Sequence, residues 1–192
     1  MPRIHIFHSA LSLTIITLCA GFLASCKKAE APATPANLPS ELVVKIGASS
    51  PLTGPQAHIG KDNENGTRMA IEDANKKGIV IGGKKVRFEL ISEDDQADPK
   101  TATIVAQKLV DAQVNGVIGH LNSGTTIPAS RIYHDNGIPQ ISPSATAVGY
   151  TAQGFQNAFR VMANDGQQGK VLGEFAANTI GADRKSVVWE RV

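Results

Sequence analysis

The sequence has 192 residues, of which 42% are hydrophobic and 19% are charged. This length allows one domain, or one domain and part of a second, and the charged share is too low for a highly charged, disordered chain. Residues 26–182 carry equal numbers of basic and acidic side chains, because the surplus positive charge lies in residues 1–25 and 183–192. A neutral body gives no electrostatic reason to expect nucleic acid as a partner.

The N-terminal segment is predicted to be an export signal. Arg3 gives it a positive start, and the apolar stretch at residues 10–23 is too short and too interrupted for a comfortable membrane span. This stretch leads into Leu-Ala-Ser-Cys at residues 23–26, which resembles the lipobox of bacterial lipoproteins. We therefore expect residues 1–25 to be a lipoprotein signal peptide and Cys26 to be lipidated. An ordinary signal peptide with an incidental cysteine is the alternative.

A flexible tether is predicted over residues 26–40, which are rich in Ala, Pro, Thr and Lys and have no apolar periodicity. A tether between a lipid anchor and a folded domain would hold that domain at a membrane surface in the periplasm. The only two cysteines of the sequence are Cys19 and Cys26. The folded body is therefore expected to have no disulfide.

Strands and helices are predicted to alternate from residue 41 onward. In chain order they are a strand at 42–47, a loop at 49–60, a helix at 67–77, a strand at 86–91, a helix that begins at 99, a strand at 117–118, a helix at 126–134, a strand at 138–141 and a helix at 166–180. Asp98 is expected to be the N-cap of the helix that begins at Pro99, and Gly78 to end the first helix. The residues expected to face inward are Ile104, Val105, Leu109 and Val110 in one helix and Val171, Leu172, Phe175 and Ala176 in the last.

This alternation predicts an α/β fold, an open parallel sheet of about four or five strands with helices on both faces. Ligands of such sheets bind beyond the carboxyl ends of the strands, where the strand order reverses. Two loops follow predicted strands at that edge, residues 120–126 and residues 142–146, and both are rich in hydroxyl groups. Each loop alone is typical of helix caps or polar turns. Together they offer donors for a carboxylate and acceptors for an ammonium, which a free amino acid carries side by side.

Several strings of the sequence resemble the leucine/isoleucine/valine-binding proteins, which are class I periplasmic binding proteins of ABC transporters. The strings are Gly54-Pro55, Glu93-Asp94-Asp95 with Asp98-Pro99, Val117-Ile118-Gly119-His120-Leu121 with Pro128-Ala129-Ser130, and Ile141-Ser142-Pro143-Ser144-Ala145-Thr146. The resemblance covers residues 43–181. It implies that the protein captures an amino acid and delivers it to a membrane permease that works with an ATPase. A branched-chain amino acid is the ligand expected first.

The same resemblance implies roles for particular residues. Ser123 and Thr146 match the residues that hold the ligand carboxylate, while the carbonyl at Ser144 and the hydroxyl of Thr146 match groups that hold the ammonium. The candidate ligand-binding residues are Ile59, Asn122, Ser123, Ser144, Ala145 and Thr146.

The sequence departs from this family in two places. Ala97 and Asn122 stand where some relatives have a disulfide pair, and Ile59 stands where they have an aromatic residue in the side-chain pocket. The second departure leaves open an alternative function, a ligand-sensing receptor for another small carboxylate or amide.

An enzyme is not expected. A phosphate-binding glycine pattern in the loop after the first strand would favour a flavodoxin-like enzyme, and this loop has none. No Ser/His/Asp or Cys/His arrangement is apparent either. His58, His120 and His134 have no metal-ligand spacing, and the acids at residues 93–98 are interpreted as caps. No cofactor or metal is therefore predicted.

The predicted fold is one lobe of a two-lobe clamshell, because residues 41–182 supply about one lobe and are expected to be an incomplete, truncated solute-binding domain. In the resembling family a second lobe follows. Residues 183–192 contain the only Trp, and charged residues interrupt their apolar pattern. We expect native sequence to end near Ala182 and these ten residues to be a non-native tail. A genuine divergent strand is the alternative.

Overall fold

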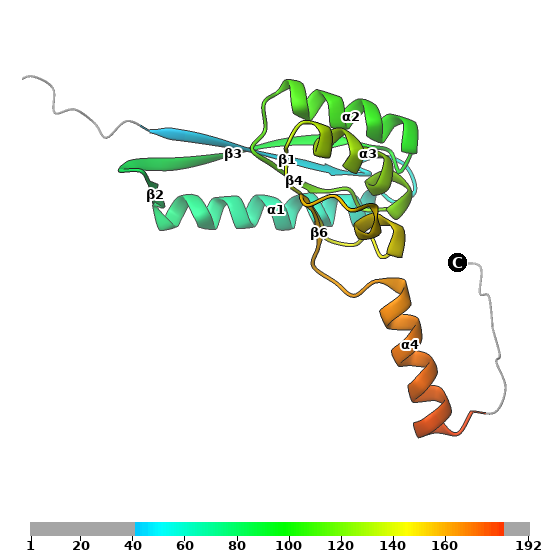
Figure 1. Cartoon of the computed structure of the whole chain (residues 1–192). Coiled ribbons are helices and arrows are strands. Elements are labelled where there is room, and N and C mark those ends of the chain that lie inside the picture. Colours follow the sequence, from blue (N-terminus) through cyan, green and yellow to red (C-terminus); the bar gives the residue numbers. More distant parts are fainter. Residues whose placement is uncertain (1–40, 183–192) are drawn as a thin grey trace, which may run out of the picture. The chain divides into compact units, whose positions relative to one another are not determined.

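Residues 41–182 are described by a computed structural model, in which six strands form a single sheet (Figure 1). The strand order is β2-β3-β1-β4-β5-β6, with only the β2–β3 pair antiparallel. The strands are β1 Leu42–Ser50, β2 Val80–Ile81, β3 Lys84–Asp94, β4 Gly116–Gly119, β5 Gln140–Ser142 and β6 Ala158–Arg160. The predicted open parallel sheet is therefore present. It gains two short strands, β2 and β6, that were not predicted.

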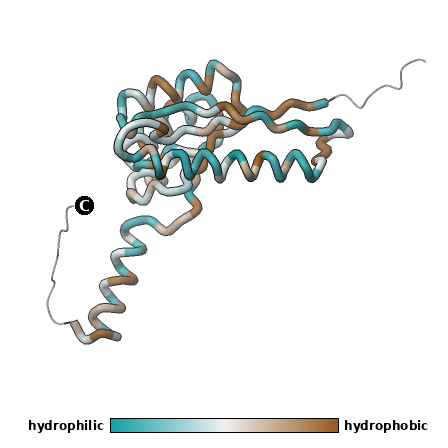
Figure 2. Tube along the Cα trace, turned by 180° about the vertical axis from the view of Figure 1, so that it is seen from behind, coloured by the Kyte–Doolittle hydropathy of each residue, from teal (hydrophilic) through white to brown (hydrophobic). Residues whose placement is uncertain are grey.

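Helices cover both faces of the sheet, with α1 on one face and α2 beside α3 on the other (Figure 1). The helices of the described chain are α1 Ala57–Lys77, α2 Pro99–Asp111, α3 Ser123–Asp135 and α4 Asp165–Phe175, with a 3₁₀ turn η1 at Val148–Gln153 and a π-helical turn η2 at Ala176–Ile180. α1 is mostly hydrophilic along its length (Figure 2), as expected for a helix with one face in water. None of these helices is long and apolar enough to cross a membrane.

The main hydrophobic core lies between the sheet and the α2–α3 pair. Its buried residues are Val105, Ala106, Leu109, Val114, Val117, Ala129, Tyr133 and Ile138. Gly47 of β1 permits close packing here, because a Cβ at this position would lie only 3.2 Å from the side chains of Leu109 and Val117. The core therefore fixes α2 and α3 directly over β1 and β4.

Residues 57–60, at the start of α1, were predicted as loop, and this prediction is wrong. The helix begins at Ala57, ten residues before the predicted start, although residues 57–66 are polar and include two glycines. Tertiary packing stabilises this part, since a Cβ on Gly60 would lie 1.9 Å from the carbonyl oxygen of Pro51. The predicted end is confirmed: Gly78 has a left-handed backbone, with φ of +65°, and its N–H donates to Asn75.

The start of α2 is as predicted, with Pro99 in its first turn and the Asp98 carboxylate accepting the N–H of Thr101 at 2.7 Å. The predicted inward face is partly wrong, because Ile104 is 52% exposed. Ala102, Val105, Ala106 and Leu109 form the buried stripe instead. Their spacing of three, one and three residues keeps them on one side of the helix, and Ile104 falls outside that stripe.

The outer edge of β3 is covered by a side chain. Beyond the short pairing with β2, the amide of Asn75 on α1 accepts the N–H of Phe88 at 2.8 Å and donates to its carbonyl at 2.9 Å. Asn75 thus supplies to Phe88 the two hydrogen bonds that a neighbouring strand would supply.

The last predicted helix is present as α4 followed by η2, and Asn164 and Gln167 form a capping box at its start. The predicted inward face is wrong. Val171, Leu172 and Phe175 are 63%, 67% and 52% exposed, and Ala176 is only partly buried. The predictions for residues 1–40, including the lipidation of Cys26, and for residues 183–192 lie outside the described residues.

Candidate ligand-binding site

The carboxyl ends of the central strands form the candidate site. β3 lies on one side of β1 and β4 lies on the other. The chain therefore crosses over β1 between β3 and β4, and the strand order reverses at β1. Open α/β sheets bind ligands at such a reversal, beyond the carboxyl ends of the strands. Loops 120–126 and 142–146 follow β4 and β5, which are neighbours in the sheet.

Hydrogen bonds join these loops, among them the one from the hydroxyl of Ser142 to the carbonyl of His120 at 2.9 Å. The hydroxyl of Ser144 donates to the carbonyl of Leu121 at 2.7 Å, and the N–H of Ala147 donates to the hydroxyl oxygen of Ser123 at 3.1 Å. The loops are therefore in direct contact, and Ser123 and Ser144, which were predicted to share a site, lie at the same place.

Several donors at the first turn of α3 have no acceptor within the described residues. The N–H groups of Thr125 and Thr126 both bond to the carbonyl of Asn122, whereas those of Ser123 and Gly124 have no such partner. The Ser123 hydroxyl accepts from Ala147 but donates to none of these residues, and the half-buried Thr146 hydroxyl is likewise unbonded. Free N–H groups at a helix N-terminus, supported by the helix dipole, favour a carboxylate.

The carbonyls of the second loop are mostly occupied. Arg160 of β6 donates to the carbonyls of Ala145 and Ala147 at 2.9 and 2.8 Å, and the N–H of Asp165 donates to that of Thr146 at 2.9 Å. Across residues 41–182, no donor reaches the carbonyl of Ser144. Arg160 thus fixes the loop while leaving an acceptor free beside it, and the sequence pattern gave no signal for this arginine.

Ile59 and Asn122 are related through Gln56, which was not predicted. Asn122 donates its side-chain N–H to Gln56 at 2.9 Å, while its own amide oxygen is buried without a partner among the described residues. Ile59 follows Gln56 by three residues, in the first turn of α1, and is 45% exposed. The start of α1 therefore approaches the start of α3. The residues at this start of α1 had been predicted as loop.

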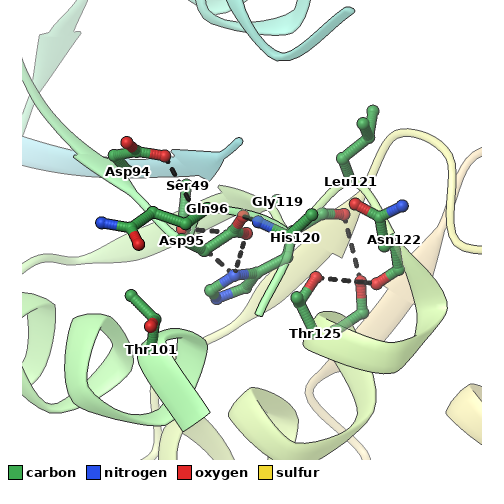
Figure 3. Close-up of polar contacts among 12 residues, drawn as sticks. Ser49, Asp94, Asp95, Gln96, Thr101, Gly119, His120, Leu121, Asn122 and Thr125 are labelled. Carbon is green, nitrogen blue, oxygen red and sulfur yellow. Dashed lines mark hydrogen bonds and ion pairs between the residues drawn. The ribbon is translucent and has the colours of Figure 1, made fainter. Parts of the chain in front are cut away.

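A buried polar cluster lies at the start of the loop after β4 (Figure 3). The Nδ1 atom of His120 is 2.7 Å from a carboxylate oxygen of Asp95 and 3.1 Å from the hydroxyl of Ser49, and all three residues are at most 1% exposed. No Ser/His/Asp arrangement was apparent in the sequence, but the fold brings these three side chains together. The cluster is not arranged for nucleophilic catalysis, because Ser49 and Asp95 meet the same ring nitrogen and neither is exposed.

The other acids near this edge have local structural roles, although Asp98 alone among residues 93–98 is the predicted helix cap. Asp94 accepts the N–H of Leu52 at 2.7 Å and the hydroxyl of Thr53 at 2.5 Å, which holds the loop after β1. Partial burial acts to raise the pKa of Asp94. The hydrogen bonds from Thr53, Gln96 and Leu52 outweigh it and hold the pKa below the ordinary value.

Sheet order, helical layers and the reversal of strand order at β1 together define a class I periplasmic binding protein fold. The sequence profile of the periplasmic binding protein family matches residues 43–188, and the chain belongs to this family. Among its relatives, the Leu/Ile/Val-binding protein homolog 1 of Brucella abortus is 45% identical over 132 residues, which is 69% of this chain and 35% of the relative. The leucine-specific-binding protein of Salmonella typhimurium is 38% identical over 148 residues, 77% of this chain and 39% of the relative.

Solved structures agree with the fold. The branched-chain amino acid binding protein LivJ of Streptococcus pneumoniae, in complex with isoleucine, has a TM-score of 0.64 and 29% identity, and the match covers 73% of this chain and 39% of LivJ. A solute-binding protein of Rhodopseudomonas palustris, in complex with 3,4-dihydroxybenzoic acid, has a TM-score of 0.59 and 27% identity, covering 71% and 36%. The predicted family and fold class are confirmed. This chain spans just over a third of the length of these relatives.

Proposed function

We propose that this chain is part of the extracytoplasmic substrate-binding component of an ABC transporter, which captures a free amino acid and delivers it to a membrane permease and its ATPase. The observation that carries this proposal is the direct contact of two loops that keep donors and an acceptor free side by side. Relatives named for binding leucine, isoleucine and valine, and LivJ in complex with isoleucine, support an amino acid as the ligand.

In this proposal the carboxylate of the ligand lies at the N-terminus of α3. The hydroxyls of Ser123 and Thr146 and the N–H groups of Ser123 and Gly124 donate to it, because these groups have no acceptor in the described chain. The ammonium donates to the carbonyl of Ser144 and to the Thr146 hydroxyl oxygen. Ala145, which is 1% exposed, fixes the turn between the two binding residues.

The ligand side chain is proposed to extend toward the start of α1, where Ile59, Gln56 and Asn122 lie. An aliphatic residue at position 59 suits a branched-chain side chain, which has no polar group to satisfy. A second candidate function is the binding or sensing of another small carboxylate or amide. The R. palustris structure with 3,4-dihydroxybenzoic acid favours this candidate, since its fold is the same and its ligand has no ammonium.

The cellular location is part of the proposal. We propose that residues 1–25 direct export, that Cys26 carries the lipid, and that residues 26–40 tether the binding domain to the membrane in the periplasm. The family description, periplasmic binding protein, supports this location. The protein is proposed to act by binding alone, as a carrier and not as an enzyme.

Calorimetric titration of the mature protein encoded by the gene tests the ligand class. Leucine, isoleucine and valine are compared with leucinamide, which lacks the carboxylate, and 4-methylpentanoate, which lacks the ammonium. We expect binding of at least one amino acid and a loss of about tenfold or more with each analogue, because each leaves buried groups unpaired. Binding of 4-methylpentanoate or 3,4-dihydroxybenzoate in preference to every amino acid would instead support the second candidate.

A further inference from the structure

Asp95 and His120 form a buried polar pair at the carboxyl ends of β3 and β4. Both side chains are 0% exposed, and the carboxylate and Nδ1 are 2.7 Å apart. Placing a carboxylate and an imidazole in a protein interior is costly unless their polar atoms are all paired. The pair therefore calls for a role that an apolar pair would not fill.

Each polar atom of the pair has a partner, and the partners determine the tautomer. One Asp95 oxygen accepts the N–H of Ala97 at 3.0 Å, and the other faces Nδ1 of His120 and the hydroxyl of Ser49 (Figure 3). Nε2 of His120 is 3.2 Å from the hydroxyl of Tyr133. The Asp95 carboxylate can only accept, so Nδ1 of His120 carries a proton that points at Asp95. Burial, together with the charge of Asp95, raises the pKa of Tyr133, so its hydroxyl keeps a proton that it can donate to Nε2.

The backbone of His120 connects this pair to both candidate loops. Its carbonyl accepts the hydroxyl of Thr126 at 3.1 Å and the hydroxyl of Ser142 at 2.9 Å. The Ser142 oxygen in turn accepts the N–H of Ala145 at 2.9 Å. One carbonyl thus holds the first turn of α3 on one side and the turn of the second loop on the other.

The backbone next to this carbonyl has little freedom of its own. A Cβ at Gly119 would lie 2.3 Å from the carbonyl oxygen of Ser49. The backbones of β4 and β1 are therefore too close here for any side chain at position 119. The direction of the His120 carbonyl is therefore coupled to the position of its ring. The ring is fixed by Asp95 on one nitrogen and by Tyr133 on the other.

We propose that His120 and Asp95 are positioning residues of the ligand site, which set the distance and angle between the two loops without touching the ligand. As a statement about ligand affinity the proposal rests on the proposed function. The positioning itself is a property of the free protein, and it can be measured when no ligand is present.

Amide hydrogen exchange, followed residue by residue by NMR in the mature protein, tests the positioning. In His120→Leu, we expect exchange at Ala145 and Thr126 to become about tenfold faster relative to exchange at Leu109 in the core. His120→Asn keeps a donor near the position of Nδ1 and should restore most of the protection. The control is His134→Leu on α3, because His134 bonds to Asn157 at 2.9 Å outside the cluster; this substitution should not change the ratio.

Asp95→Asn keeps the shape of the pair but turns one acceptor into a donor, and it replaces His120→Leu if that variant does not fold. The same selective increase at Ala145 and Thr126 is expected. An equal increase at all amides, including Leu109, would overturn the proposal, because it would mean that the pair stabilises the domain as a whole. Unchanged protection at Ala145 in both variants would overturn it as well.

Titration with leucine separates this proposal from the proposed function. If the unsubstituted protein binds leucine, Asp95→Asn should weaken binding about tenfold and His120→Asn much less. If it binds no amino acid while the selective exchange effect is present, the proposed function fails and the positioning role stands. If the protein binds leucine but exchange increases equally at all amides, the proposed function stands and the positioning role fails.

Discussion

The hydroxyl of Ser144 donates a 2.7 Å hydrogen bond to the carbonyl of Leu121, which lies 23 residues earlier in the chain. This bond joins the loop after β5 to the loop after β4, and each loop thereby limits the movement of the other. A site made of two joined loops is organised before a ligand arrives, which reduces the entropy lost on binding. The contact between Ala147 and Ser123 acts in the same direction.

Removal of the proposed carboxylate donors should weaken ligand binding. Ser123→Ala and Thr146→Ala are each expected to raise the Kd for the preferred amino acid about ten- to a hundredfold, since a hydrogen bond to a charged group contributes roughly 1.5–3 kcal/mol. Titration calorimetry and thermal melts of the same variants measure affinity and stability. Thr103→Ala is the control, because this hydroxyl bonds to the carbonyl of Lys100 on the exposed side of α2. Intact affinity with a lowered Tm in both site variants would show that these residues are only structural.

Arg160 should affect both stability and affinity. Arg160→Met removes the donors to the carbonyls of Ala145 and Ala147, and we expect a loss of about 2 kcal/mol in the free energy of unfolding, measured by urea denaturation. Affinity should fall with it, because the loop is no longer fixed. Arg131→Met is a matched control, since Arg131 forms an exposed ion pair with Asp135 that should contribute less than about 1 kcal/mol. Equal effects of the two substitutions would contradict the role of Arg160.

The contribution of Asp94 to stability should depend on pH. Its pKa is lowered in the folded protein from an ordinary 3.8, so at low pH the unfolded chain binds more protons than the native one. The stabilisation by Asp94 is therefore fully present when the pH is above the ordinary pKa of 3.8. It is lost as the pH falls through the lowered pKa of Asp94 in the folded protein. Urea denaturation of the protein and of Asp94→Asn over this acidic range should give a difference in stability that shrinks with falling pH. A difference in stability that stays constant with pH would argue against this contribution of Asp94.

The tautomer of His120 is a further prediction. With ¹⁵N-labelled histidine, two-bond ¹⁵N–¹H correlations should show a proton on Nδ1 and none on Nε2. His58, which is exposed on α1, serves as the internal comparison. Detection of a proton on Nε2 of His120 would reverse the donor and acceptor roles assigned to Tyr133 and Asp95.

Lipidation can be tested with the two cysteines of the sequence. Labelled palmitate should be incorporated into the protein and into Cys19→Ala, because Cys19 lies within the predicted signal peptide. Cys26→Ala should incorporate none and should not be processed as a lipoprotein. Equal labelling of Cys26→Ala and the unsubstituted protein would exclude this cysteine as the anchor.

Local signals in the sequence were sufficient for most of the fold. Asp98 with Pro99, and Gly78, mark helix ends that the structure has, and the alternation of strands and helices predicted the parallel sheet. The first turns of α1 were missed because they depend on the contact of Gly60 with Pro51, a tertiary interaction between polar, glycine-containing segments. Strands of two or three residues, such as β2 and β6, are too short to carry a period.

The candidate site was predicted in part for the same reason. Loops that follow neighbouring parallel strands must meet, so Ser123 and Ser144 could be placed together from their positions in the chain. Arg160 and Gln56 could not, because each acts through partners that are distant in the sequence or on an element that was predicted as loop. The meeting of Asp95 and His120 depends on β3 and β4 lying on either side of β1, and no local pattern contains that order.

The side chain of Asn75 gives the sheet a property beyond stability. Its amide occupies both the N–H and the carbonyl of Phe88, so a strand from another molecule finds no open hydrogen-bonding pair at this point of β3. An uncovered sheet edge is where another partly folded chain would join. A single asparagine on a helix thus closes this point of the sheet edge to another strand.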